Sequence, residues 1–268
     1  MVSQRDGAIE GVDRSDMGRY RILILGGTTE ARHLAELLAE RPEFETTISL
    51  AGRTEAPKPL PVPTRIGGFG GASGLADYLV EQKIDLMIDA THPFANQISA
   101  NAAKAAQATG VPVFALCRPG WVRQAYDRWI SVGSVAAAVI ALGQAPRRVF
   151  LSIGRQEAHR FSAAPQHSYL VRSVDPVEPP LKVPDCRYIL ATGPFRAEGE
   201  TDLFRFNRID TLVTKNSGGL ATYSKIEAAR ALGLAVIMIE RQVPPGIRTV
   251  HDAEAALELV DHLLSPAK

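Results

Sequence analysis

The architecture of the chain is indicated most directly by the stretch Arg21-Ile-Leu-Ile-Leu-Gly26-Gly27-Thr28-Thr29-Glu30-Ala31. Its apolar run is short, partly β-branched and bounded by glycines, which is typical of a central strand in a parallel sheet. The two glycines allow the backbone to approach a ligand. The helix that follows would present unpaired N–H groups and the positive end of its dipole, which attract a phosphate. The stretch therefore predicts a nucleotide-binding strand–turn–helix unit, with Thr28 and Thr29 as additional hydroxyl donors.

The same stretch matches the dinucleotide fingerprint G-x-G-x-x-G/A incompletely. Counted from Gly26, the second glycine position holds Thr28 and the third position holds Ala31. A Gly-Gly turn also connects a strand to a helix in doubly wound folds generally. The turn by itself therefore leaves a purely structural role open.

Length and composition favour two linked domains that act on a small molecule. A chain of 268 residues is long enough for one large or two smaller domains, and 46% hydrophobic with 22% charged residues is ordinary for a globular protein. The formal net charge of +1 provides no long-range attraction to nucleic acid or to a membrane surface. We expect neither as a partner, and we expect a monomer because no assembly surface is visible in the pattern.

Cysteine usage and the absence of long apolar segments predict a cytoplasmic protein. Cys117 and Cys186 lie far apart, without C-x-x-C spacing or flanking histidine ligands, so neither a metal site nor a disulfide framework is indicated. No window reaches the ~18–20 apolar residues that span a bilayer. Residues 1–19 are polar and lack the apolar core of a signal peptide, so we expect a flexible leader there.

Strand-like and helix-like segments alternate along the chain, which predicts an α/β fold of two Rossmann-like, doubly wound domains with parallel sheets and an interdomain cleft. The break at Gln144-Ala145-Pro146 separates an N-terminal NADP-binding domain, residues 20–143, from a C-terminal α/β domain, residues 144–268. The expected strands cover residues 22–25, 46–51, 86–90, 113–116, 149–153, 169–174, 188–191, 211–214 and 235–239. The expected helices cover residues 30–40, 73–82 with Ser73 as its cap, a segment that ends near 108, and residues 135–142, 198–207, 221–232 and 253–264.

The charge at the end of the second expected strand favours NADP over NAD. Arg53 lies there, 27 positions after Gly26, where an NAD-binding fold usually has an acidic residue against the ribose hydroxyls. An arginine at this place pairs with the 2′-phosphate of NADP, whereas a carboxylate repels it. The alternative is a solvated surface arginine.

A second group of polar residues follows the strand over residues 86–90. The segment Asp89-Ala90-Thr91-His92-Pro93-Phe94 would sit at the crevice where ligands bind in open α/β sheets. His92 is a candidate proton donor or carboxylate ligand, since its unperturbed pKa lies near ~6.5. Its alternative role is that of a loop histidine that bonds local backbone groups, and Asp89 is equally suited to a structural role.

Two further turns follow expected strands and carry cations. Thr214-Lys215-Asn216-Ser217-Gly218-Gly219 combines an ammonium group, hydroxyl and amide donors and two glycines, which suits an anionic ligand. Arg118-Pro119-Gly120-Trp121 combines a guanidinium with a large aromatic ring that is able to clamp a flat, acidic substrate. The structural alternatives are a helix-capping turn for the first segment and a packed hydrophobic anchor for Trp121.

Taken in order, these segments resemble the precorrin-6A reductase family of cobalamin biosynthesis. The likeness rests on the segments 25–31, 67–71, 89–95, 118–121 and 215–219 and extends from about Arg21 to Val243. Each motif is weak alone, and the combination is specific. The resemblance implies an oxidoreductase with two Rossmann-like domains that reduces a double bond of the precorrin-6A macrocycle with NADPH at a site between the domains.

These motifs and the resemblance lead to an expected role for each of several residues. Lys215 and His92 are the candidate catalytic residues, with the proton donor left open between them and water. The expected cofactor contacts are Gly26, Gly27, Thr28, Thr29, Glu30, Arg53, Gly68, Ala90 and Thr91. The expected substrate contacts are Arg118, Trp121, Ser217 and Gly218.

Three alternative functions are weighed against this one. A cobalt-containing analogue is the alternative substrate, because a related reductase serves the cobalt-dependent branch of the pathway. A non-enzymatic NADP-sensing module is the alternative outside enzymology. A short-chain dehydrogenase is disfavoured, because none of the six tyrosines is followed by lysine at the Tyr-x-x-x-Lys spacing.

Overall fold

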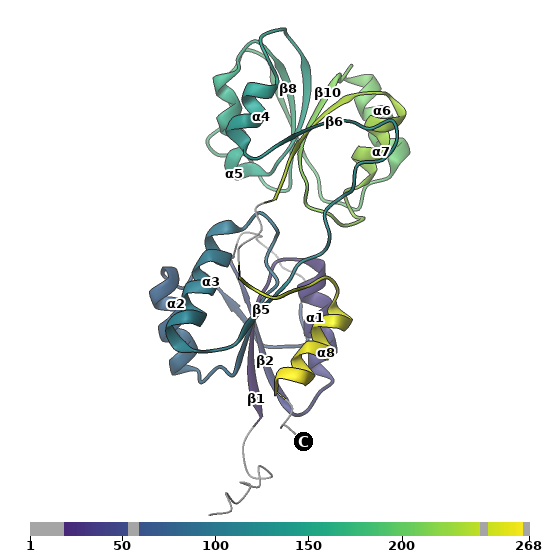
Figure 1. Cartoon of the computed structure of the whole chain (residues 1–268). Coiled ribbons are helices and arrows are strands. Elements are labelled where there is room, and N and C mark those ends of the chain that lie inside the picture. The colour runs from purple at the N-terminus through teal and green to yellow at the C-terminus, as the bar shows by residue number, and fades with distance from the viewer. Residues whose placement is uncertain (1–18, 53–58, 242–245, 265–268) are drawn as a thin grey trace, which may run out of the picture.

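Two six-stranded sheets form the framework of the protein (Figure 1). The computed structural model describes residues 19–52, 59–241 and 246–264. All strand pairings in both sheets are parallel, and helices lie on both faces of each sheet. This arrangement confirms the predicted α/β class. Within the described ranges, no helix is long and apolar enough to cross a membrane.

The first sheet has the strand order β12-β5-β4-β1-β2-β3. The order reverses between β1 and β4, and such a reversal opens a crevice at the carboxyl ends of the strands. The strands are β1 (Tyr20–Leu25), β2 (Phe44–Leu50), β3 (Thr64–Ile66), β4 (Leu86–Asp89), β5 (Val113–Leu116) and β12 (Thr249–Val250). The helices are α1 (Thr29–Ala39), α2 (Gly71–Glu81), α3 (Asn96–Thr109) and α8 (Ala253–Leu264).

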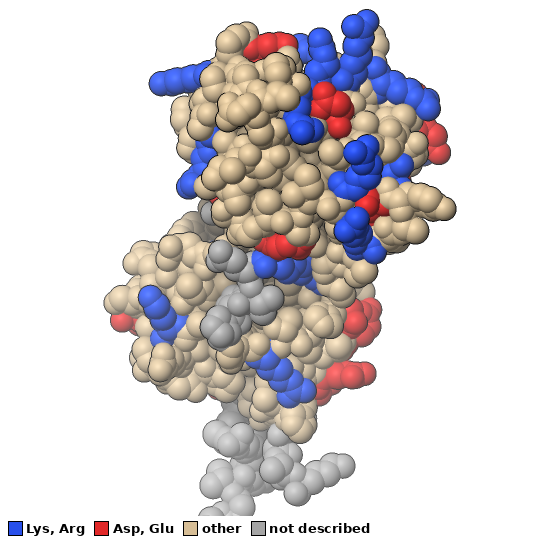
Figure 2. Space-filling view, turned by 45° about the horizontal axis from the view of Figure 1, so that its top comes forward, with Lys and Arg blue, Asp and Glu red and all other residues tan. Residues whose placement is uncertain are grey.

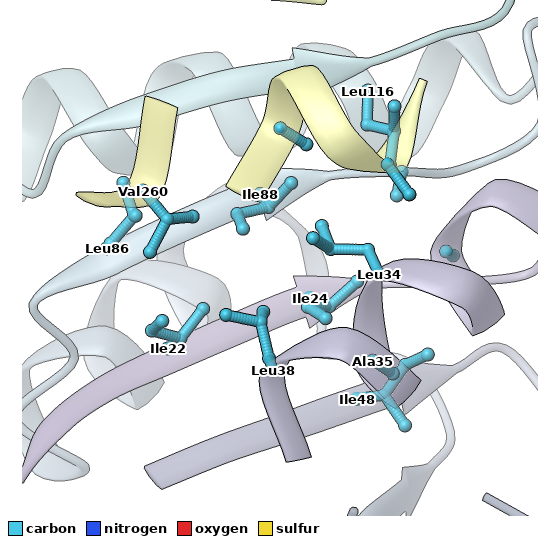
Figure 3. Packing of buried hydrophobic residues seen from close by; sticks show 14 of the residues in the cluster. Ile22, Ile24, Leu34, Ala35, Leu38, Ile48, Leu86, Ile88, Leu116 and Val260 are labelled. Carbon is cyan, nitrogen blue, oxygen red and sulfur yellow. The ribbon is translucent and has the colours of Figure 1, made fainter. Parts of the chain in front are cut away.

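The core of this first domain is built on both faces of β1. Ile22 and Ile24 point toward α1 and α8, where they join a cluster that includes Leu34 and Val260 (Figure 3). The alternate residues Leu23 and Leu25 pack into a separate cluster under α2 and α3. Burial on both faces explains why the β1 sequence is a continuous apolar run.

The second sheet has the strand order β6-β11-β10-β7-β8-β9. Its strands are β6 (Arg128–Val132), β7 (Arg148–Ser152), β8 (Ser168–Ser173), β9 (Cys186–Leu190), β10 (Thr211–Lys215) and β11 (Ala235–Ile239). The helices are α4 (Val135–Ala141), α5 (Arg155–Ala158), the 3-10 helix η2 (His159–Ala163), α6 (Ala197–Phe206) and α7 (Ser224–Ala231). In Figure 1, α4 and α5 cover one face of the sheet, and α6 and α7 cover the other.

The strand order corrects the expected domain boundary between residues 143 and 144. β6 pairs with β11, and α4 packs on the core of the second sheet, so the second domain already begins before residue 128. β12 pairs with β5, and α8 packs against α1, so the end of the described chain belongs to the first domain. The chain therefore passes between the domains twice, along residues 117–127 and again after residue 240.

Several local expectations also change. β3, β6 and β12 are strands that the sequence did not predict, because two of them are only two or three residues long and β6 is largely exposed. Ser73 does not cap α2, which begins at Gly71 with Gly70 in a left-handed conformation as its N-cap. The predicted leader lies outside the described residues apart from Arg19.

The placement of α8 leads to a prediction about stability. Leu259 is 4% exposed within the first-domain core, whereas Leu263 on the same helix is 40% exposed. We expect Leu259→Ala to lower the free energy of unfolding of the first domain by about 2–5 kcal/mol, because it leaves a cavity. Leu263→Ala, the matched control, changes it by under about 0.5 kcal/mol. Hydrogen exchange locates the effect, and loss of protection in β10 rather than in β1 would contradict this domain assignment.

A buried histidine of the second domain makes stability depend on pH. His167 is 2% exposed, and burial lowers the pKa of its imidazole. Below pH ~6.5 the unfolded chain binds a proton that the folded protein resists, so stability is complete above that pH and is lost as pH falls. We expect His167→Gln to flatten the decline between pH 7 and 5 in urea denaturation. An unchanged slope would show that other groups cause it.

Candidate active site

The turn between β1 and α1 has the geometry of a phosphate-binding turn. A Cβ on Gly26 would lie 2.7 Å from the Ile48 side chain, so a larger residue would require Ile48 on β2 to shift. Gly27 has a φ of +127°, and a Cβ on it would meet nothing within 4 Å. The turn is therefore open on its outer side, where the first N–H groups of α1 have no intrahelical acceptors.

Thr28 joins this turn to the loop after β4. Its Oγ1 accepts a hydrogen bond from the N–H of Ala31 at 3.1 Å, which caps α1. The same hydroxyl donates to the carbonyl oxygen of Ala90 at 2.9 Å. The hydroxyl proton of Thr28 is thus already used within the protein, and the backbone N–H groups are what the turn offers to a phosphate.

The loop after β4 is held in shape by a buried carboxylate. Asp89 is 6% exposed, and its Oδ1 accepts hydrogen bonds from the N–H of Thr91 at 3.2 Å and from the Thr91 hydroxyl at 2.7 Å. Downstream, the N–H of Phe94 donates to Nδ1 of His92, and the two rings lie 5.9 Å apart. Asp89 therefore has a structural role here, while His92 stands exposed at the tip of the loop.

Phe94 brings this loop into contact with the second domain. Its side chain packs against the core of the second sheet, and the ammonium nitrogen of Lys215 lies 5.1 Å from the centre of its ring. Lys215 ends β10, and its Nζ also forms an ion pair with Oε2 of Glu157 at 2.5 Å. The carboxyl ends of β4 and β10 therefore face one another, and both His92 and Lys215 lie near Phe94.

Arg118 bridges the two domains. Its Nη1 donates to Oε2 of Glu30 in the first turn of α1 at 2.8 Å, and its Nε donates to the carbonyl oxygen of Ser217 at 2.8 Å. The Arg118 and Glu30 side chains are 18% and 22% exposed. Gly219 allows this approach, because a Cβ there would lie 2.9 Å from the Arg118 Nε. Arg118 thus ties the beginning of α1 to the loop after β10.

Trp121 anchors the connecting segment on the second domain. Its indole N–H donates to the carbonyl oxygen of Gly219, and its ring lies against Tyr223 and beneath the ammonium group of Lys225. Gly218 is required for the same close approach, because a Cβ on it would lie 2.1 Å from the carbonyl oxygen of Pro119. In this arrangement Trp121 is a packed anchor, the alternative that its sequence also allowed.

The structure adds residues that the motifs did not single out as functional. Glu157 holds Lys215, and Phe94 joins the domains, as described above. Asn216 is buried and exchanges hydrogen bonds with the backbone of Trp121 at 2.7 and 3.1 Å. Arg241 donates to the carbonyl oxygens of Arg118 and Asn216, which holds the two connecting segments together. Phe94 and Asn216 lie inside the quoted motifs, whereas no sequence signal marked Glu157 or Arg241.

Two further observations show which features do not belong to the candidate site. Within the described ranges, no group of three or more His, Cys, Asp or Glu side chains is arranged to hold a metal ion. A depression of about 330 Å³ runs along α6, but its lining residues, which include Glu198 and Arg205, come from that helix alone and lie outside these loops. Arg53, the expected 2′-phosphate ligand, lies outside the described residues.

The fold and these loops define a class: a two-domain Rossmann-like α/β protein with a phosphate-binding type of turn at the switch point of its first sheet. Comparison with known proteins is more specific. The model of the family described as "Precorrin-6x reductase CbiJ/CobK" matches residues 21–261, and the chain belongs to this family. The resemblance found in the sequence is thereby confirmed.

Individual relatives agree with the family assignment. The chain is 60% identical to a precorrin-6A reductase of Sinorhizobium sp, over 95% of this chain and 98% of the relative. It is 53% identical to the precorrin-6A reductase of Rhodobacter capsulatus, over 92% and 98%. A solved structure titled "CobK precorrin-6A reductase" is 51% identical and superposes with a TM-score of 0.85, covering 91% of this chain and 97% of that one.

The bridge between the domains leads to a prediction. Because the Glu30–Arg118 pair is partly buried, we expect Glu30→Gln and Arg118→Met to be non-additive, with a coupling of roughly 0.5–3 kcal/mol in a double-mutant cycle on the free energy of unfolding. The exposed pair Arg21–Glu45, with side chains 42% and 55% exposed, is the control and should couple by under ~1 kcal/mol. Additive effects at Glu30 and Arg118 would show that the bridge does not stabilise the domain arrangement.

Proposed function

We propose that the protein reduces a carbon–carbon double bond of the precorrin-6A macrocycle to give the dihydro product, with NADPH as the reductant, in cobalamin biosynthesis. The observation that carries this proposal is the 60% identity to a precorrin-6A reductase across nearly the whole chain. The arrangement of the loops supports it, because the carboxyl ends of β4 and β10 meet where a cofactor and a second ligand would come together. A monomer acting in the cytoplasm remains our prediction.

The residues of the first domain fit a dinucleotide. The turn at Gly26 and Gly27 leaves open backbone at the start of α1 for a pyrophosphate, and Thr29 lies in the first turn of that helix. Gly68, Ala90 and Thr91 follow strands on either side of the switch point, where the two halves of a dinucleotide separate. Glu30 lies beside this turn, with its charge balanced by Arg118.

In this proposal NADPH supplies a hydride to the macrocycle. The protein contributes the relative position of the two ligands and a proton for the adjoining atom. Lys215 is the residue we assign to that proton, because its ammonium group lies at the domain contact and is held by Glu157. His92 is the second candidate, since it stands exposed on the facing loop.

The charge distribution suits a substrate that carries carboxylates. Residues 117–241, the second domain with its connecting segment, contain 17 Lys and Arg against 11 Asp and Glu, whereas the rest of the chain contains 13 against 18. Figure 2 shows most of the visible positive side chains on the upper lobe, which is the second domain. In this reading the substrate lies against the second domain, near Ser217 and Gly218, with Arg118 and Trp121 holding that loop in place.

Identity favours the metal-free macrocycle over its cobalt complex. The relatives named cobalt-precorrin-6A reductase are 29% identical in Methanothermobacter thermautotrophicus and 28% identical in Priestia megaterium. The decisive assay is anaerobic oxidation of NADPH with precorrin-6A, followed together with the absorption change of the macrocycle. Coupled turnover is the expected result. NADPH binding without turnover on verified substrate would favour the cobalt-containing substrate or a sensor of NADP.

The assignment of Lys215 predicts a specific loss. We expect Lys215→Met to lower kcat by roughly 10²-fold or more while the affinity for NADPH stays unchanged, because the proton donor is lost and the first domain is intact. Lys182→Met, at an exposed position of the same domain, is the control and should retain full activity. Normal turnover of Lys215→Met, combined with a large loss in His92→Asn, would transfer the proton-donating role to His92.

A further inference from the structure

Arg65 occupies a distinctive place beside the proposed cofactor turn. It lies on the short strand β3, which pairs with β2 in the register Ser49 to Arg65 and Leu50 to Ile66. In dinucleotide-binding sheets, the end of the strand at the β2 position reaches the ribose of the adenosine half. Arg65 is therefore close to where this ribose would lie, and NADP differs from NAD by the phosphate on the 2′ position of that ribose.

The guanidinium of Arg65 is held in a fixed position. Its Nη1 donates to the carbonyl oxygen of Gly67 at 2.6 Å and, more weakly, to the Ser49 hydroxyl at 3.4 Å. Its Nη2 donates to the carbonyl oxygen of Gly68 at 2.8 Å. The group also stacks 3.9 Å from the centre of the Phe69 ring. Binding an anion here would therefore cost little side-chain entropy.

Among the described residues, no acidic side chain neutralises the charge of Arg65. All of its hydrogen-bond acceptors are neutral, and no carboxylate in the described part of the chain pairs with it. Other arginines of the first domain do have acidic partners, such as Arg41 with Asp261 and Arg118 with Glu30. A half-buried guanidinium without a counter-ion favours a ligand that brings negative charge.

The backbone beside Arg65 leaves space for such a ligand. A Cβ on Gly67, Gly68 or Gly70 would meet no atom of the described residues within 4 Å, so those residues leave the outer side of the turn open. From this space, the charge and the position beside β2, we infer that Arg65 binds the 2′-phosphate of the NADP adenosine and thereby determines the choice of NADP over NAD. The inference rests on the proposed function and adds a specificity residue to Arg53.

The alternative is that Arg65 only shapes the turn at Gly67 and Gly68. A structural role would weaken every adenine nucleotide alike, whereas a 2′-phosphate ligand discriminates between nucleotides with and without that group. The pair adenosine 2′,5′-bisphosphate (2′,5′-ADP) and 5′-AMP isolates this difference, because the two molecules differ only in the 2′-phosphate.

The test is calorimetric titration of the full-length protein with both nucleotides. For Arg65→Met we expect the affinity for 2′,5′-ADP to fall about 10- to 100-fold while that for 5′-AMP changes less than about 3-fold. Arg65→Lys keeps the charge and should retain part of the preference. Arg53→Ala measures the contribution of the other cation, and Arg248→Ala, exposed at the opposite edge of the sheet, is the control. Circular dichroism checks that each variant is folded.

The outcomes separate the two proposals. An equal loss for both nucleotides, or no loss for either, overturns the role of Arg65 while the wild-type preference for 2′,5′-ADP still supports NADPH as the reductant. If the wild-type protein itself does not prefer 2′,5′-ADP, the proposed choice of cofactor fails and the inference falls with it. If Arg65→Met unfolds, Arg65→Gln, which also removes the charge, replaces it, and the same ratio of affinities decides.

Discussion

The N-terminal part of the chain does not complete the first sheet and its core, because β12 and α8 come from the other end of the described chain. The rest of the architecture depends on this constraint. Ile22 and Ile24 on β1 need an apolar cover, and α8, from the far end of the described chain, supplies part of it. The chain must therefore leave the first domain, build the second and return. This requirement creates two connecting segments, which Arg241 joins through the carbonyl oxygens of Arg118 and Asn216.

The double connection places the loops at the carboxyl ends of both sheets against each other. Glu30 and Arg118 link the start of α1 to the loop after β10, and Phe94 links the loop after β4 to Lys215. The groups that we assign to the cofactor and those that we assign to the substrate thus belong to one connected network. In a reduction that depends on holding two ligands in register, such a network supplies positional precision.

Much of the fold was accessible from the sequence because its signals are local. The apolar run of β1, the Gly-Gly turn and the alternation of strands and helices reflect burial on both faces and the geometry of the turn, which neighbouring residues determine. The domain boundary was not accessible in this way. β12 is only two residues long, and β6 carries no continuous apolar run, so their partners β5 and β11 are defined by pairing across long sequence separations.

For the site, the sequence by itself determined the family and the motifs from which its loops are built, because these are patterns of consecutive residues. Only the tertiary structure decided what each side chain does: that Thr28 joins two loops, that Trp121 is an anchor, that Glu157 pairs with Lys215, and that Arg65 lacks a carboxylate partner among the described residues. The physical reason is that hydrogen bonding and charge compensation depend on distances between residues that lie far apart in the chain, and those distances exist only after folding.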